Sequence, residues 1–381
     1  MRTIVHLSHT DIRTDSRILK ELKALYELDN NLLIGIGLER SESNVSINQF
    51  DYCQIITLKM RTRSFSVFPR FIRLLLFTWL WTAIEMHIKM IVTSLKYKPR
   101  VLHCHDVYVL PAGFILKLIT GCSLVYDAHE LESEKNGTKR IESVIIKLIE
   151  GFSWKSIDLF ITVSDSIHDW YIKKYGINNG IVILNSPVIS ACNAIESNYL
   201  RRKYEIPIEK KIFIYVGMLM PGRGIDLYLD VFQDERVDSH IVFLGYGIYD
   251  LEIREMSLSN EKIHLHEPVE HSEVVGIIST ADFGLCMIEN ISLSDYYCLP
   301  NKLFEYIFAG LPVIASRNPE IENLVIKYKL GVCCDNSKED LIRCINNVST
   351  IKVSVNNLEL YELGWHAQTS KLVESYKNLI R

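Results

Sequence analysis

Short hydrophobic runs typical of buried β-strands alternate with longer amphipathic runs along almost the entire chain, and this alternation constrains the fold more than any other feature. It predicts an α/β protein in which parallel sheets are covered by helices on both faces. The first series of strand-like runs comprises Thr3–Leu7, Leu32–Gly35, Ile55–Leu58, Val101–His105, Ser123–Tyr126, Leu159–Val163 and Ile181–Leu184. After a polar stretch at residues 185–210, the second series comprises Ile212–Gly217, His240–Leu244, Ile263–His266, Phe283–Met287 and Val313–Ala315.

The polar stretch at 185–210 indicates two similar α/β units. A chain of 381 residues is also too long for one typical hydrophobic core, so we expect two domains with a cleft between them. We place the domains at residues 1–190 and 205–364, with a final helix at residues 365–381.

Composition excludes some classes of function. The net charge of −4 argues against a nucleic-acid-binding protein, because a surface that binds nucleic acid normally makes its domain basic. The nine cysteines contain no C-x-x-C pair, so reduced thiols in a cytosolic protein fit best, with Cys333 and Cys334 in a strand or loop. The N-terminal MRTIVHLSHT is expected to be a strand and not a signal peptide, since it has no long apolar core.

Basic residues concentrate between Lys59 and Arg100, where nine of them stand against the single acid Glu85. They surround the apolar run Phe71–Ile84, which is too short to span a bilayer. One interpretation is a helix that lies on the cytoplasmic face of an anionic membrane. The alternative is a buried helix with basic ends. The side chains expected at the membrane are Trp79, Trp81, Arg63, Arg70 and Arg73.

The segment Leu299–Ser316, with the sequence LPNKLFEYIFAGLPVIAS, places one carboxylate and one amine in an otherwise apolar helix. Asn301 is expected to cap this helix and Gly310 to end it. At helical spacing, one buried face would then carry Leu303, Phe304, Ile307 and Phe308.

Glu305 lies off this apolar stripe, one turn after Asn301, where the hydroxyls of a sugar diol could be its partners. Lys302 and the free N–H groups of the first turn would attract a phosphate. The alternative is an ordinary core helix whose Glu305 reaches solvent.

A glycine-bearing loop is expected within Ile212–Asp226, with the sequence IFIYVGMLMPGRGID, between a strand and the start of a helix. Such a loop brings backbone N–H groups against a diphosphate, and Arg223 could add a bidentate contact, or could be a solvated surface arginine. Because the sequence contains no D-x-D triplet, we expect no metal to bridge carboxylates to a diphosphate.

The string P-N-K-L-F-E-Y-(x)₂-A-G-L-P-V-I-A-S resembles the donor-nucleotide motif of retaining GT-B glycosyltransferases, in particular glycosyltransferase family 4. The resemblance implies two Rossmann-like α/β/α domains that face each other across a cleft. Residues 1–190 would bind the acceptor and residues 205–364 the nucleotide sugar, while the final helix would cross back to the first domain.

The resemblance also implies roles for residues of the second domain. Glu305 would hold the nucleotide ribose as the second glutamate of the family's E-x₇-E pair, whose first position is Tyr297 here, so that Tyr297 or Asp295 could substitute for that glutamate. In the family's G-R-x₄-K-G loop, Met218 replaces the arginine and Arg223 the lysine. The remaining residues implied to bind the donor are Gly217, Gly222, Gly245, Pro268, Val269, Asn301, Lys302 and Leu303.

In the first domain, polar residues follow two strands, where open α/β sheets bind their ligands. The resemblance makes His129 the histidine near the reacting sugar, so the implied catalytic residues are His129, Arg223, Lys302 and Glu305.

Asp15 or Ser16 is expected to cap a helix that runs to Leu28, and Arg13 or Arg17 could reach a phosphate. A zinc site at His103 and His105 lacks a second ligand pair in the sequence, so no metal is expected. The candidate acceptor-binding residues are Asp11, Arg13, Asp15, His105, Asp106, Asp127, His129 and Glu130.

The resemblance implies a retaining, metal-independent hexosyl- or hexosaminyltransferase that needs no cofactor besides its nucleotide-sugar donor, with UDP favoured over GDP. Its acceptor would be a saccharide, expected to be lipid-linked, in bacterial surface-polysaccharide synthesis, and the protein would be cytoplasmic and peripheral to the membrane. The alternatives are a nucleotide-sugar epimerase of the same fold, or a catalytically silent binding subunit.

Overall fold

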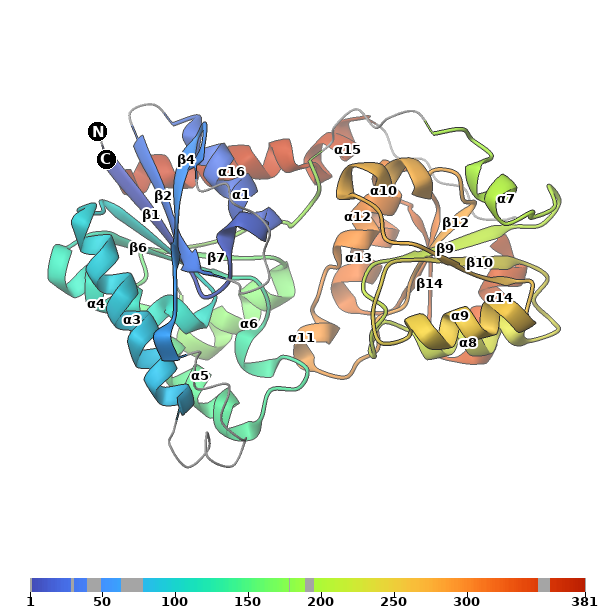
Figure 1. The fold of residues 1–381 in the computed structure, drawn as a ribbon, viewed down its shortest axis with the longest axis horizontal. Helices are drawn as coiled ribbons and strands as arrows, with labels where there is room; N and C mark the ends of the chain where they lie inside the picture. The colour runs from blue at the N-terminus through green and yellow to red at the C-terminus, as the bar shows by residue number, and fades with distance from the viewer. Residues whose placement is uncertain are drawn as a thin grey trace. The chain divides into compact units, whose positions relative to one another are not determined.

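The computed structural model describes residues 2–28, 31–39, 49–62, 78–177, 179–188, 195–348 and 357–380. The chain forms two compact units. Unit 1 contains Met1–Ile183 together with Thr369–Arg381, and unit 2 contains Leu184–Gln368 (Figure 1).

Unit 1 is built on an eight-stranded sheet with the strand order β3-β4-β2-β1-β5-β6-β7-β8. All of its strand pairs are parallel except β3 with β4. The strands are β1 (Arg2–Ser8), β2 (Asn31–Leu38), β3 (Gln49–Phe50), β4 (Cys53–Leu58), β5 (Val101–His105), β6 (Ser123–Ala128), β7 (Leu159–Thr162) and β8 (Gly180–Val182).

Helices cover both faces of this sheet (Figure 1). The α-helices are α1 (Ser16–Tyr26), α3 (Thr78–Lys96), α4 (Leu110–Thr120), α5 (Arg140–Ser153), α6 (Asp165–Tyr175) and α16 (Trp365–Ile380). Short 3-10 helices lie at Ile12–Thr14, Val107–Val109, Glu132–Glu134 and Trp154–Ser156.

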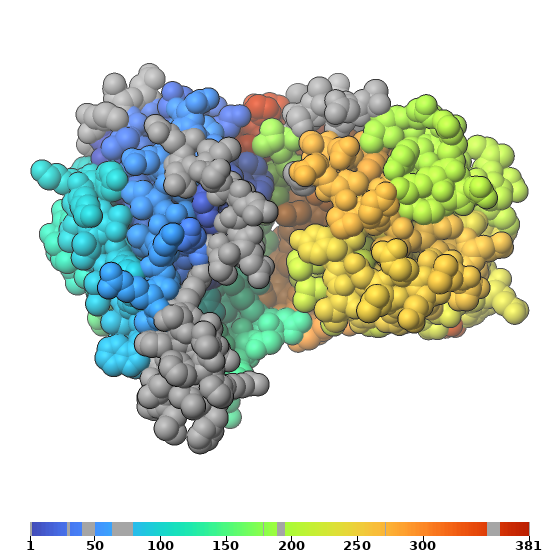
Figure 2. All heavy atoms as spheres, in the orientation of Figure 1, coloured from blue at the N-terminus to red at the C-terminus, as the bar shows by residue number. Residues whose placement is uncertain are grey.

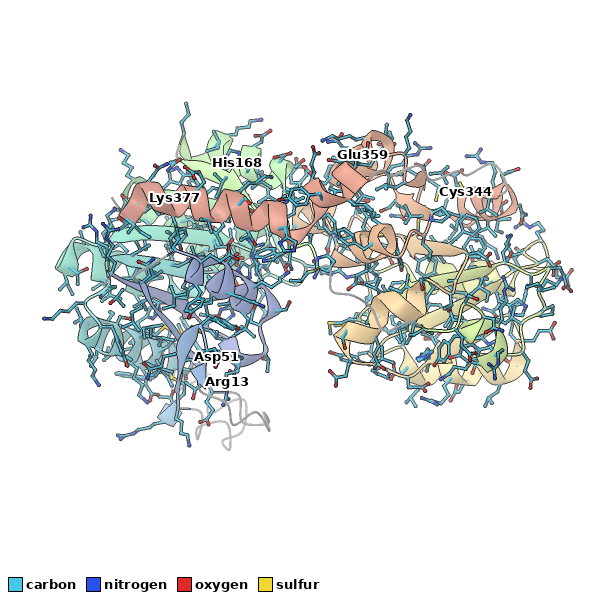
Figure 3. All side chains as sticks on the ribbon, turned by 90° about the horizontal axis from the view of Figure 1, so that it is seen from above. Arg13, Asp51, His168, Cys344, Glu359 and Lys377 are labelled. Carbon is cyan, nitrogen blue, oxygen red and sulfur yellow. The ribbon has the colours of Figure 1, made fainter. Side chains whose placement is uncertain are left out.

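Alternation along β5 shows which helix covers which face. Cys104 points to α4, since a Cβ on Gly113 of that helix would lie 2.3 Å from its sulfur. His103 points to the opposite face, where its Nδ1 lies 2.6 Å from the hydroxyl of Tyr376 on α16. Figure 3, in which Lys377 marks α16, shows this helix lying along unit 1.

Unit 2 is built on a six-stranded, fully parallel sheet with the order β11-β10-β9-β12-β13-β14. Its strands are β9 (Ile212–Val216), β10 (His240–Leu244), β11 (Ile263–His266), β12 (Phe283–Cys286), β13 (Val313–Ser316) and β14 (Gly331–Cys334). Its helices are α7 (Tyr199–Lys203), α8 (Ile225–Gln233), α9 (Asp250–Ser259), α10 (His271–Ile278), α11 (Leu293–Tyr296), α12 (Asn301–Phe308), α13 (Pro319–Lys327), α14 (Lys338–Asn346) and α15 (Asn357–Leu363).

Two hydrophobic cores flank this second sheet because successive strand residues point to opposite faces. Ile212, Ile214 and Val216 of β9 pack in the core that includes residues of α10, α12 and α13. Phe213 and Tyr215 pack in the other core, against α8 and α14. The strands are buried on both sides, which is why each reads as an almost continuous apolar run.

The α/β class with two parallel sheets is confirmed, and every strand-like run that we predicted overlaps a strand. Two strands were missed: β3, which is only two residues long, and β14, which contains Cys333 and Cys334. Asp15 caps α1 as expected, since its carboxylate accepts hydrogen bonds from Arg17 N and Ile18 N.

Candidate active site

Two glycine turns lie together at the carboxyl edge of the second sheet. Gly217 follows β9 with φ +121°, and its N–H donates to Leu244 O at the end of β10 (3.0 Å). The Leu219 N–H donates to Tyr246 O (2.8 Å), so the two turns stay hydrogen-bonded to each other beyond the ends of their strands. A Cβ on Gly245 would lie 1.9 Å from Gly217 O, so the close approach of these backbones requires glycine.

We expect Gly245→Ala to disrupt this edge, because the added methyl would have to displace the backbone of the neighbouring turn. Thermal unfolding should show a loss of about 1–3 kcal/mol in the free energy of unfolding, as is typical of overpacking. Nucleotide binding measured by calorimetry should weaken as well. Gly137→Ala is a useful control for nucleotide binding, because its positive φ (+80°) strains an alanine there, while open space around its Cβ position leaves its neighbours in place. Equal effects of the two substitutions on nucleotide binding would contradict the assignment of this sheet edge to nucleotide binding.

Helix α12 is fixed against the same edge by Tyr306. Its hydroxyl lies 3.1 Å from each of three backbone atoms: Val216 N, Ile214 O and Leu285 O. The ring sits on Gly284, where a Cβ would come within 2.5 Å of it. This anchor places the first turn of α12 beside the Gly217 turn.

Lys302, in that first turn, is 8% exposed, and its ammonium has no hydrogen-bond partner among the described residues. Its Nζ lies 3.6 Å from the ring centroid of Tyr215, and a Cβ on Gly217 would be 3.8 Å from it. Burial lowers the pKa of Lys302 to about 7. A buried amine beside a glycine turn with no hydrogen-bonding group to satisfy it is suited to an anionic ligand.

Arg223 lies at the same edge. Its Nη1 is 3.6 Å from Asp295 Oδ1, and its side chain is 39% exposed. Asp295 is itself held by Ser292, whose hydroxyl lies 2.7 Å from Asp295 Oδ2. Met218 carries no charge and is half exposed, but its carbonyl accepts a hydrogen bond from Tyr215 Oη (2.7 Å). The two cations of this edge are therefore Lys302, which is buried, and Arg223, which is accessible.

The other sequence-predicted donor residues are placed less uniformly. Glu305 is only 7% exposed, so it does not extend into solvent, and Tyr297 lies half-buried in the turn between α11 and α12.

The prediction that Asn301 caps α12 is wrong by one residue: Pro300 is the cap residue, and its carbonyl accepts a hydrogen bond from Leu303 N (3.1 Å). The side chain of Leu303 is fully buried in a core, while Pro268 and Val269 follow β11 at the neighbouring strand end. Gly222, with φ +83°, accepts a hydrogen bond from Glu289 N.

In unit 1, His129 lies at the carboxyl end of β6. Its Nε2 is 3.1 Å from Asp127 Oδ2 and its Nδ1 is 3.9 Å from Asp106 Oδ1. Burial opposes protonation, but the carboxylates of Asp106 and Asp127 raise the pKa of His129 to about 10. His129 is therefore a cation at neutral pH that donates hydrogen bonds. The backbone of Asp106 is strained, with φ +66° at a residue that is not glycine.

Several of the predicted acceptor-binding residues are buried in unit 1 and contact other residues of that unit. His105 and Asp127 are fully buried. Asp127 accepts two hydrogen bonds from Arg17 (3.0 and 2.9 Å) and thereby fixes α1 to the sheet. Asp11 is paired with Arg13 (2.6 Å), whereas Glu130 is exposed.

Sequence reasoning missed Glu21 and His6, which lie fully buried beside His103 and His105. The signal that could have found Glu21 is an ionic pair, four residues apart, on the buried face of α1: Arg17 Nε lies 3.2 Å from Glu21 Oε1.

An exposed apolar surface extends over three helices of unit 1, since α3 packs on α4 and α4 on α5 (Figure 1). Figure 2 shows α3 and α4, in light blue and cyan, at the surface of this unit. The large apolar side chains that are at least half exposed here are Trp79, Trp81, Ile88, Val92, Leu118, Ile119, Ile141, Val144, Leu148 and Phe152. α3 is therefore not the fully buried helix of the alternative interpretation; Arg63, Arg70 and Arg73 lie outside the described residues.

Two family models match parts of the chain. The model described as Glycosyltransferase Family 4 matches residues 54–188, and the model described as Glucosyltransferase 3-like, C-terminal domain, matches residues 236–358. No curated protein sequence matches the chain.

Solved structures match over the whole length. Sucrose-phosphate synthase from Thermosynechococcus elongatus is 14% identical, with a TM-score of 0.78 over 100% of this chain and 99% of that one. Anabaena Alr3699/HepE in complex with UDP is 12% identical, with a TM-score of 0.74 over 99% and 100%. The lipopolysaccharide outer core galactosyltransferase WaaB is 12% identical, with a TM-score of 0.65 over 99% of each chain.

The fold is that of the GT-B glycosyltransferases, and the two family models that match parts of the chain both describe glycosyltransferases. The N-terminal match makes the chain similar to glycosyltransferase family 4, as the donor motif at Leu299–Ser316 implies.

Proposed function

We propose that this protein is a retaining glycosyltransferase that moves a hexosyl or hexosaminyl group from a UDP-sugar to a hydroxyl of a lipid-linked saccharide in surface-polysaccharide synthesis. The observation that carries the proposal is the ammonium of Lys302, buried beside the Gly217 turn without a hydrogen-bond partner among the described residues. A diphosphate would supply the missing acceptor oxygens and the opposite charge.

The choice of donor is supported by similar structures. HepE has been solved with UDP and with UDP-glucose. In this chain, Arg223 and Lys302 stand where they could hold the diphosphate, and Glu305 one turn further along α12 could accept hydrogen bonds from a ribose diol.

In the proposed reaction, the acceptor oxygen forms a bond to C1 of the sugar while the bond from C1 to the β-phosphate oxygen breaks. Attack occurs on the face that the leaving group departs from, and a leaving phosphate oxygen takes the proton of the acceptor hydroxyl. The work of the protein is then to stabilise negative charge on the leaving diphosphate. Arg223 and Lys302 supply the positive charge for this task, so the proposed mechanism needs no metal bound to the diphosphate.

The exposed apolar surface on α3, α4 and α5 supports a membrane-bound acceptor. Two exposed tryptophans at the start of α3 and the cations Lys96, Lys139 and Arg140 around the surface suit an anionic bilayer. None of the described helices combines the length and the hydropathy needed to cross a bilayer. We therefore place the protein at the surface of the cytoplasmic membrane.

The double substitution Trp79→Ala/Trp81→Ala should weaken binding to phosphatidylglycerol vesicles by about tenfold or more, because burial of one aromatic side chain contributes about 1.5–3 kcal/mol. Cosedimentation measures this effect. The matched control is Ile208→Ala/Leu258→Ala, which removes two exposed apolar side chains of unit 2 (83% and 86% exposed) and should leave binding unchanged. Equal binding by both double variants would rule out this surface as the membrane contact.

A thermal-shift screen of nucleotide sugars tests the donor assignment, because a ligand that binds only the native state raises the melting temperature. UDP and a UDP-sugar should raise it more than GDP does. Turnover is then measured with and without a lipid-linked acceptor. Conversion of the donor into an epimer without acceptor would identify an epimerase, and binding without any turnover would identify a silent subunit; either result would refute the proposal.

A further inference from the structure

A cluster of metal-binding side chains lies in the interior of unit 1 and has no role in the proposed transfer. His6 of β1, Glu21 of α1, and His103 and His105 of β5 are each fully buried. One possible ligand atom from each residue lies within 4.8 Å of those of the others. Three imidazoles and a carboxylate form a ligand set that suits zinc.

The fold brings these residues together in a simple way. β1 and β5 are neighbouring parallel strands, and His6 is in register with His103. His105 is two residues further along β5, so its side chain points to the same face of the sheet. Helix α1 covers this face and supplies Glu21 from its buried side.

Two of the spacings within the cluster are close to those of a tetrahedral site. Bonds of about 2.0–2.1 Å from zinc to nitrogen place neighbouring ligand atoms about 3.3 Å apart. Here His6 Nδ1 lies 2.9 Å from His105 Nε2, and His103 Nε2 lies 3.6 Å from Glu21 Oε2. The imidazole rings are close to parallel, with 18° between His103 and His105, so metal binding needs rotation about χ2, which is a soft torsion in histidine.

Unsatisfied polar atoms provide a second, independent observation. His103 Nε2 and both carboxylate oxygens of Glu21 are buried and have no hydrogen-bond partner among the described residues. Arg17 is close to Glu21, but its hydrogen bonds go to Asp127 and to the carbonyl of Ile183. Buried polar atoms without partners are rare in native proteins, and a bound ion is one of the explanations for them.

Outer groups already orient two of the histidines. His103 Nδ1 lies 2.6 Å from the hydroxyl of Tyr376, which leaves its Nε2 available. His105 Nδ1 lies 3.1 Å from His129 Nε2 and 3.4 Å from Asp127 Oδ2, while its Nε2 faces His6. Hydrogen bonds of this kind from the second ring nitrogen are typical of metal-binding histidines.

We propose that His6, Glu21, His103 and His105 bind one zinc ion, which links β1, β5 and α1 and, through Tyr376, α16. The ligands are fully buried, so the ion is enclosed as in structural sites, and it enters as the chain folds. It has no part in the chemistry of the donor diphosphate, which is assigned to unit 2.

Elemental analysis of protein produced in zinc-supplemented medium tests this directly and should find one zinc per chain. Refolding with Co²⁺ should give the intense visible absorption of a four-coordinate site, and removal of the metal by a chelator during refolding should lower the melting temperature. The proposal would be overturned if protein produced in zinc-supplemented medium contained no bound metal. It would also be overturned if refolding with Co²⁺ gave no visible absorption and refolding with a chelator left the melting temperature unchanged.

Variants locate the ion. Tyr376→Phe removes only the outer hydroxyl and should weaken metal affinity by about 10–100-fold, and Glu21→Gln should lower the zinc content further. His240→Gln is the matched control: His240 Nδ1 lies 3.0 Å from His264 Nε2, but this pair belongs to no group of three or more metal ligands among the described residues. Full zinc content in Glu21→Gln, or its loss in His240→Gln, would show that the metal binds elsewhere. Should Glu21→Gln fail to fold, the Co²⁺ spectrum and the Tyr376→Phe affinity decide the question.

Discussion

Lys302→Met should abolish most sugar transfer while it stabilises the ligand-free protein. The leaving diphosphate loses the cation buried beside the Gly217 turn, and removal of one such preorganised contact lowers kcat by about 10²–10³-fold. The melting temperature rises because a buried amine without a hydrogen-bond partner among the described residues is replaced by an apolar side chain of similar length. Steady-state kinetics and thermal unfolding measure the two effects.

Lys327→Met is the control for this substitution, because Lys327 lies on the surface of α13 in the same unit. It should change neither kcat nor the melting temperature appreciably. If Lys302→Met keeps near-normal turnover, Lys302 does not bind the leaving group. If it loses activity but is also less stable, the amine has a structural role that the ligand-free structure does not explain.

The pH dependence of UDP binding gives a further signature of Lys302. Its pKa is lowered to about 7, so the amine is charged below pH 7 and increasingly neutral above it. A diphosphate favours the charged form, so binding above pH 7 takes up a proton, and affinity falls as the pH rises from 7 to 9 by at most about tenfold per unit. Calorimetry in buffers of different ionisation enthalpy measures the uptake, which should vanish in Lys302→Met.

Glu305→Gln is the second substitution with a large expected effect. A charged carboxylate that accepts hydrogen bonds from a ribose diol contributes about 1.5–3 kcal/mol, so the loss of charge should weaken UDP-sugar binding by about 10–100-fold. Binding of inorganic pyrophosphate, which has no ribose, should be unchanged. Comparison of these two ligands by calorimetry separates a ribose contact from general damage to the site.

Glu322→Gln on α13 is the matched control for Glu305→Gln, since Glu322 is a partly exposed glutamate that pairs with Arg317 (3.0 Å). It should bind both ligands normally. A Glu305→Gln variant that binds UDP-sugars as tightly as the original protein would exclude Glu305 from the nucleotide site.

Local patterns predicted much of unit 2 because its features depend on residues close in sequence. Gly310 ends α12 with φ +72°, and Gly217 has a positive φ where the loop was expected. The cap at Asn301 was misplaced because Pro300 takes the cap position, and cap boundaries depend on backbone geometry that sequence patterns fix only within a residue or two.

The sequence by itself determined the two series of parallel strands, the glycine turns and the cations near them, because hydrophobic periodicity and turn chemistry act over a few residues. Only the tertiary structure decided that Asp127 and His105 are interior groups, that Lys302 is buried without a hydrogen-bond partner among the described residues, and that His6 and Glu21 meet His103. These outcomes follow from strand order and from the helix that covers each face, which bring together residues as far apart as His103 and Tyr376.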